Sequence, residues 1–126
     1  MTAPDLIYHL ALRDEWASAV ESGADYRRST LGRSLDEEGF IHCSFRDQVA
    51  PTADLLFRGR DDVLLLSIDP GRVPGPVRVE SLDGGGTAFP HIYGPLPLAA
   101  VVRAEPVPVA ADGTLLVASL LGRPGV

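Results

Sequence analysis

All three histidines of this 126-residue chain lie in short apolar segments of strand length, Leu6–Leu10, Gly39–Ser44 and Phe89–Gly94. Runs this short, rich in Ile, Phe and Tyr, are typical of β-strands. Taken singly, each histidine is best explained as a half-buried strand residue bonded to a backbone carbonyl. Three together make a shared functional cleft an equal alternative, because each apolar segment must desolvate an imidazole or give it a partner.

The remaining pattern predicts further strands and two helices around these segments. Val63–Leu66 is a continuous apolar run, which is typical of a central strand covered on both faces. Gly23 is placed to end the first helix, and Pro51 fits only in the first turn of the second. In full, the predicted strands are Leu6–Leu10, Phe40–Ser44, Asp62–Ile68, Val77–Ser81 and Ala99–Pro106, and the predicted helices are Arg13–Ser22 and about Arg46 to Phe57.

Helical spacing also predicts which side chains face the core. The inward face of the first helix is expected to hold Trp16, Ala17 and Val20, and that of the second Val49, Ala53, Leu56 and Phe57. Residues Ala24 to Glu38 lack periodicity and are expected to be mostly irregular. Gly84–Gly86 is expected to be a turn, and Asp112–Leu121 fits a helix or a strand equally well.

Composition limits the partners and the compartment. The length predicts one domain, residues 1–126. All eleven cations are arginine and the net charge is −6, which disfavours large nucleic acids and anionic membranes but leaves room for an arginine pocket for one phosphate. Cys43 is the single cysteine, so neither a disulfide nor a CxxC metal site is expected. With no leader-like segment or membrane-length apolar run, a cytoplasmic protein is expected.

Strand alternation predicts which groups can meet. Phe40, His42 and Ser44 share one face, whereas Cys43 lies on the opposite face and is a core residue rather than a nucleophile. His91 shares a face with Tyr93, and His9 shares one with Ile7. Gln48, at the start of the following helix, is close enough to reach toward His42 or a ligand.

These segments resemble one family in order and spacing. Ile7–His9, Trp16, Gly39–Ser44, Gln48, Arg78–Glu80 and Phe89–Leu96 are similar to the domain-of-unknown-function 952 family over about residues 5 to 108, with 109–126 as a C-terminal extension. That family is grouped by fold with the ADP-ribosyltransferase superfamily. The resemblance therefore implies an α+β domain with a split, mostly antiparallel sheet flanked by two or three helices.

The superfamily binds NAD in the cleft of its split sheet, and the resemblance implies roles for residues of this chain. His9 and Ser44 would bond the nicotinamide ribose or amide, and His42 would orient the ring. His91 stands where a catalytic glutamate is expected and would polarise the ribose or the nucleophile. The further ligand-binding residues implied are Gln48, Tyr93, Arg33 as a clamp for the pyrophosphate, and Glu80.

Glu80 supplies the missing negative charge only if its strand faces the cleft; an ion pair on the sheet surface is an equal alternative. Three function classes remain open. The first is a transferase or glycohydrolase that uses NAD or a phosphorylated nucleotide as substrate, without a metal. The second is a non-catalytic small-molecule-binding module. The third is a three-histidine metal hydrolase, although the sequence has no HxH or HExxH spacing. The oligomeric state is left open.

Overall fold

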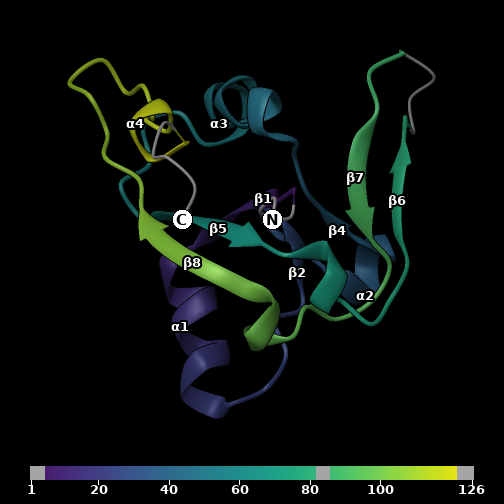
Figure 1. Cartoon of the computed structure of the whole chain (residues 1–126). Helices are drawn as coiled ribbons and strands as arrows, with labels where there is room; N and C mark the ends of the chain where they lie inside the picture. Colours follow the sequence, from purple (N-terminus) through teal and green to yellow (C-terminus); the bar gives the residue numbers. More distant parts are fainter. Residues whose placement is uncertain (1–4, 82–85, 122–126) are drawn as a thin grey trace.

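The computed structural model describes residues 5–81 and 86–121 as an α+β fold of antiparallel strands and short helices (Figure 1). The strands are β1 (Ile7–Leu12), β2 (Arg28–Thr30), β3 (Arg33–Ser34), β4 (Ile41–His42), β5 (Val63–Ile68), β6 (Val77–Glu80), β7 (Phe89–Ile92) and β8 (Val101–Pro106). The helices are α1 (Arg13–Ser22), α2 (Leu35–Glu38), α3 (Val49–Leu56) and α4 (Ala118–Leu121). None of the helices in these ranges is long and apolar enough to cross a bilayer.

The described strands form two three-stranded sheets, ordered β1-β5-β8 and β4-β7-β6, and a β2-β3 hairpin. Every pairing between them is antiparallel. The two larger sheets meet at one bridge, where the N–H of Tyr8 donates to the carbonyl of Ser44 at 2.9 Å and the N–H of Ser44 donates back at 2.7 Å. The sequence predicts one split sheet, whereas the structure has two separate sheets that are joined at this bridge.

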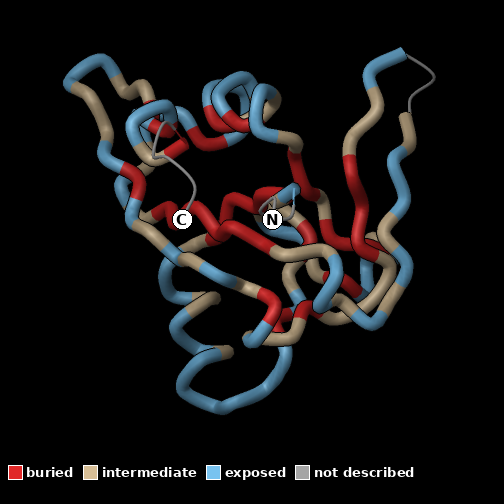
Figure 2. Tube along the Cα trace, viewed as in Figure 1, coloured by how far each residue is buried: buried red, intermediate tan, exposed pale blue. Residues whose placement is uncertain are grey.

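Strand β5 is central in its sheet, as its apolar run predicts, and all six of its residues are buried. Leu66 and Ile68 face the same core cluster as Ile7 and Tyr26, whereas Leu65 on the other face belongs to a second cluster with α3. Helix α1 covers one face of this sheet, and α3 and α4 lie on the other side (Figures 1 and 2). The alternation of β1 therefore sends His9 toward the Tyr26 side.

Helix α1 has its predicted bounds but not its predicted inward face. Gly23 ends it with φ +73° and bonds the carbonyls of Ala19 and Val20. Trp16 and Ala19 pack against the core, whereas Ala17 and Val20 are exposed. The prediction for Ala17 and Val20 was wrong because the helix meets the sheet along its 16/19 edge, and a ten-residue sequence does not reveal that rotation.

Helix α3 begins later than predicted, because Arg46–Gln48 forms a 3₁₀ turn ahead of Val49. Pro51 accordingly falls in the first turn of α3. Val49, Ala53 and Phe57 are buried as expected. Leu56, by contrast, is 45% exposed, so its predicted inward position is wrong.

Residues Ala24 to Glu38 are more ordered than their composition predicts, since they contain β2, β3 and α2. Gly32 makes the hairpin turn with φ +75°. Ser34 then caps α2 reciprocally: its hydroxyl accepts from the Glu37 N–H at 3.2 Å, and the Glu37 carboxylate accepts from the Ser34 N–H at 2.9 Å. The prediction of an irregular segment was wrong because a capping box stabilises even one helical turn.

The predicted strand Phe40–Ser44 is reduced to β4 with a single bridge at Ser44. Asp112–Leu121 ends in the short helix α4. Gly84 and Gly85 of the predicted turn lie outside the described residues. The turn before β6 runs close to the end of β7: a Cβ placed on Gly75 would lie 2.5 Å from the carbonyl oxygen of Tyr93, so the two backbones approach this closely only with glycine at position 75.

Candidate functional site

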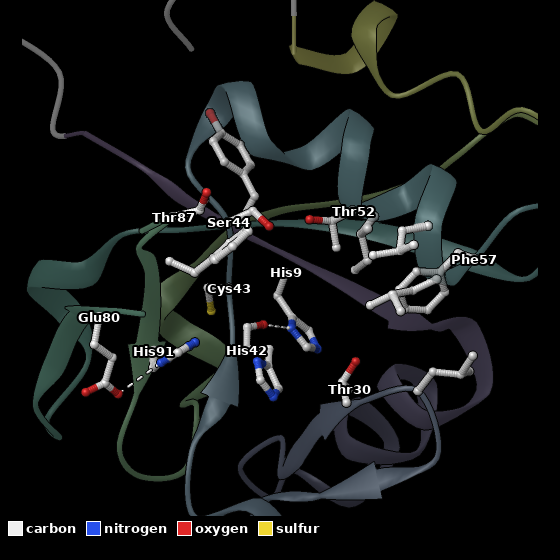
Figure 3. Close-up of a pocket in the computed structure, with 16 residues that line it drawn as sticks. His9, Thr30, His42, Cys43, Ser44, Thr52, Phe57, Glu80, Thr87 and His91 are labelled. Carbon is white, nitrogen blue, oxygen red and sulfur yellow. Dashed lines mark hydrogen bonds and ion pairs between the residues drawn. The ribbon is translucent and has the colours of Figure 1, made fainter. Parts of the chain in front are cut away.

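A cavity of about 500 Å³ lies between the two larger sheets, α3 and the β2-β3 hairpin. All three histidines line it (Figure 3). His9 comes from β1, His42 from β4 and His91 from β7, so segments distant in the sequence contribute to one wall. The volume lies in the range of small-molecule sites.

His42 and His91 form a pair across two neighbouring strands. They are direct register partners in the antiparallel β4-β7 pairing, so both side chains lie on the same face. Their ring centroids are 5.1 Å apart, with the planes nearly perpendicular at 85°. Phe40 packs against both rings, with centroid distances of 4.6 Å to His42 and 4.4 Å to His91. The two imidazoles are therefore held close together against an aromatic wall.

Glu80 of β6 holds His91. Its Oε2 accepts the Nδ1–H of His91 at 3.0 Å and also the hydroxyl of Tyr93. These bonds, the Tyr93 bond first, lower the pKa of Glu80 below its usual value, so the carboxylate is ionised at neutral pH. Because Glu80 lies opposite Phe89 in the β6-β7 register and both line the cavity, the strand presents Glu80 on the cleft side.

Glu38 of α2 holds His42. The Nε2–H of His42 donates to the Glu38 carboxylate at 3.3 Å, and the guanidinium of Arg33 donates to the other oxygen of Glu38 at 2.7 Å. Burial lowers the pKa of His42 below 6.5, although the Glu38 carboxylate acts in the opposite direction. Arg33, the predicted pyrophosphate clamp, is exposed and outside the cavity lining, with its charge turned to Glu38.

His9 is bonded within the protein at both ring nitrogens. Nδ1 lies 2.6 Å from the carbonyl oxygen of His42, and Nε2 lies 3.0 Å from the hydroxyl of Tyr26. A carbonyl only accepts, so Nδ1 carries the proton and Nε2 accepts from Tyr26. Burial lowers the pKa of His9 to about 4. His9 is thus a neutral ring that fixes the backbone of β4 beneath the His42–His91 pair.

The other predicted ligand-binding residues divide between the cavity and its support. Ser44 lines the cavity and is buried. Gln48 does not line it. Its side-chain Oε1 accepts from the Phe45 N–H at 2.9 Å, and its Nε2 donates to the Ala88 carbonyl at 2.8 Å. These bonds connect the residues before α3 to the residue before β7. Tyr93 also lies behind the lining, bonded to Glu80 and covered by Arg78 at 5.0 Å from the ring centroid.

Two important residues escaped the sequence analysis. Tyr26 bonds His9, and Glu38, which bonds His42, lies in the segment that was expected to be mostly irregular. Of these residues, Glu38 alone could have been suggested by the sequence, because it lies four residues before His42. That spacing brings the two side chains together because Gly39, with φ +87°, reverses the direction of the chain between them.

The cavity lining has an unusual charge pattern. Among the described residues that line it, Glu80 is the one carboxylate, and none is arginine. Hydroxyl groups of Thr30, Thr52 and Thr87 supply neutral hydrogen-bonding capacity. A dinucleotide would therefore find imidazoles but no guanidinium for its pyrophosphate. The described residues also include no group of three or more His, Cys, Asp or Glu side chains arranged to hold a metal ion.

Comparison with known proteins places this architecture in a family. The family model described as "Protein of unknown function (DUF952)" matches residues 10–104. No curated protein matches the chain.

The chain is similar to protein CC0527 from Caulobacter crescentus, with 31% identity. The crystal structure of CC0527 matches with a TM-score of 0.81, and the match covers 94% of this chain and 99% of CC0527. The crystal structure of a double mutant of CC0527 gives the same values. The solution NMR structure of CC0527 gives 0.76, covering 91% and 95%. With three quarters of its residues inside the family match, the chain belongs to the DUF952 family of proteins of unknown function.

Proposed function

We propose that the cleft is an acid–base active site that cleaves a small organic molecule, with His42 as the base and His91 as the acid. The observation that carries the proposal is the His42–His91 pair: two imidazoles 5.1 Å apart at opposite register positions, each held by its own glutamate, on one cavity wall. Paired acid and base groups of this kind commonly accelerate a reaction by about 10²–10⁴-fold each.

His42 suits the role of base. Its Nε2–H is directed to Glu38, which leaves Nδ1 as the nitrogen with a lone pair, and Nδ1 has no hydrogen-bond partner among the described residues. Because burial lowers the pKa of His42 below 6.5, the ring is neutral at pH 7 and able to accept a proton.

His91 suits the role of acid. Its Nδ1–H donates to the ionised Glu80, and Nε2 has no partner among the residues that the structure describes. When Nε2 is also protonated, the Glu80 carboxylate balances the positive charge of the ring. His91 then has a proton to give to a leaving group.

The proposed step is a hydrolysis. A water molecule loses a proton to Nδ1 of His42, and its oxygen forms a bond to the electrophilic carbon of the substrate. The bond from that carbon to the leaving atom breaks, and the leaving atom takes the proton from Nε2 of His91. Return of the proton from His42 to His91 through water restores both rings, so the net reaction consumes one water.

The same experiment also tests alternative functions of the cavity. A binding module without turnover is favoured by the mostly apolar lining of the cavity, which includes Leu10, Leu31 and Phe89. The second alternative is an enzyme that uses NAD or a phosphorylated nucleotide, as the resemblance to the ADP-ribosyltransferase superfamily implies. The imidazoles on the cavity wall are compatible with a nicotinamide ring. A three-histidine metal centre that used Nε2 of His9 would first have to break the hydrogen bond between that nitrogen and the Tyr26 hydroxyl.

The test follows the ¹⁵N and ¹H resonances of the three imidazoles during titration with NAD, nicotinamide, adenosine 2′-phosphate and a set of uncharged esters and amides, with product analysis of each mixture. We expect a substrate to shift His42 and His91 while His9 stays constant. His42→Ala should reduce turnover at least about 100-fold, and Glu21→Gln on the exposed face of α1 serves as the control. Ligand shifts without product would support the binding module. Ligands that stabilise the protein without moving either imidazole would contradict the proposal.

A further inference from the structure

We infer that the substrate is an uncharged amphipathic molecule, whose apolar segment lies between the β2-β3 hairpin and the C-terminal end of α3. Its reacting group would face His42 and His91. The inference rests on the proposed acid–base function and deepens it by assigning a substrate class.

The apolar end of the cavity is formed by leucines that the protein itself does not cover. Leu55 is 80% exposed and Leu56 is 45% exposed, yet both line the cavity. Leu31, in the turn of the β2-β3 hairpin, lines it as well, and Phe57 is buried in the adjacent wall. Apolar side chains that flank a cavity and remain in contact with water gain most from a ligand that covers them.

The ionisable Glu80 and His91 and the apolar end lie on different sides of the cavity. Figure 3 shows Glu80, His91 and Thr87 on one side and Phe57 with Thr30 on the other, with His9 and His42 between them. A ligand that reaches from the imidazole pair to the leucines must therefore carry a polar group at one end and an apolar segment at the other.

The charges around the cavity disfavour an anionic ligand. Glu80 is ionised and repels an anion. Two arginines beside the histidine pair are already engaged: Arg33 is bonded at 2.7 Å to Glu38, the partner of His42, and Arg78, the register partner of His91, lies over the ring of Tyr93 at 5.0 Å. An anionic group in the cavity would lose its hydration without meeting an available guanidinium among the described lining residues. Threonine hydroxyls suit neutral donors and acceptors instead.

The test compares two probes that share an alkyl chain, N-hexylacetamide and hexyl phosphate. We expect the amide to bind at least tenfold more tightly, with shifts at His42 and His91. In the series of butyl, hexyl and octyl amides, binding should become about fourfold tighter for each added methylene, as expected for burial of apolar surface. Leu55→Ser and Leu56→Ser should each weaken amide binding at least fivefold. Leu116→Ser, at a leucine outside the cavity whose exposure (43%) matches that of Leu56, should have no effect.

The outcomes separate this inference from the proposed function. Equal or tighter binding of hexyl phosphate, with both imidazoles shifted, would overturn the neutral substrate class and leave the acid–base pair in place. Unchanged affinity in both leucine variants, or no binding of any amide at millimolar concentration, would overturn the apolar subsite. Amide binding that depends on Leu55 and Leu56 but moves neither imidazole would retain the apolar subsite and overturn the catalytic role of the histidines.

Discussion

The two larger sheets use histidine in opposite ways. In β1-β5-β8, His9 is 3% exposed and has protein partners at both ring nitrogens. In β4-β7-β6, His42 and His91 each give one nitrogen to a glutamate and keep the other without a partner among the described residues. All three occupy similar apolar segments. The number of ring nitrogens that the fold leaves unbonded, rather than burial alone, therefore separates a structural histidine from a chemical one.

The surroundings of the sheets explain this difference. Strand β5 is buried on both faces between two core clusters, and although the neighbouring His9 also lines the cavity, both of its ring nitrogens are satisfied within the protein. The β4-β7-β6 sheet has a cavity on its histidine face, and its edge strand β6 exposes Arg78 and Val79. Water or a ligand can complete the hydrogen bonding of His42 and His91 there.

Substituting each kind of histidine tests this difference directly. His9→Ala leaves the Tyr26 hydroxyl and the His42 carbonyl unsatisfied beside a new void, and should cost about 3–4 kcal/mol of unfolding free energy. His42→Ala, at a side chain 37% exposed, should cost less than about 1 kcal/mol. Urea denaturation at pH 7 measures both. Similar losses in the two variants would show that the division between structural and chemical histidines is wrong.

Acid should act mainly on the structural histidine. The pKa of His9 is lowered to about 4 in the fold, against 6.5 in the unfolded chain. Between these values the unfolded state binds a proton that the folded state does not. The His9 contribution to stability is therefore complete above pH 6.5, declines as pH falls, and reaches a loss of up to about 3 kcal/mol near pH 4.

Urea denaturation from pH 7 to pH 4 measures this loss, and an NMR titration assigns it to His9, since other groups also titrate in the range. The His9 resonances should remain those of the neutral Nδ1–H form down to about pH 4.5. Titration of His9 near pH 6.5 would contradict its description as a fully bonded, buried ring.

A substitution of Glu38 tests its influence on the pKa of His42. Its carboxylate raises the pKa of His42 against the larger effect of burial, so Glu38→Gln should lower the pKa of His42 further. Asp36→Asn is a matched control in the same short helix, because Asp36 pairs with Arg27 instead. NMR titration of His42 in the two variants decides: an unchanged or higher pKa in Glu38→Gln would remove Glu38 from the site.

Local patterns predicted part of this arrangement. The apolar run in β5 predicted its central position, and period-two alternation placed His42 with Phe40 and His91 with Tyr93. These predictions succeeded because they depend on neighbours within one strand.

The features that sequence patterns could not supply depend on contacts between distant segments. The partners of His9 are 17 and 33 residues away in sequence, and one of them is a backbone carbonyl that no side-chain pattern marks. The helix faces around Val20 and Leu56 were mispredicted because the rotation of a helix on a sheet is set by the packed core. Gln48 was close to His42 in sequence, but tertiary pairing gave it to Ala88.

The close approach at Gly75 extends the site beyond the residues that touch the cavity. Adding one methyl group there would press on the Tyr93 carbonyl and separate the strands that bring Glu80 to His91. A relative that retains every histidine and glutamate but bears a larger residue at this turn would need a rerouted backbone. When such a homologue is assigned the same chemistry, the residue at the position of Gly75 should be considered together with the histidines.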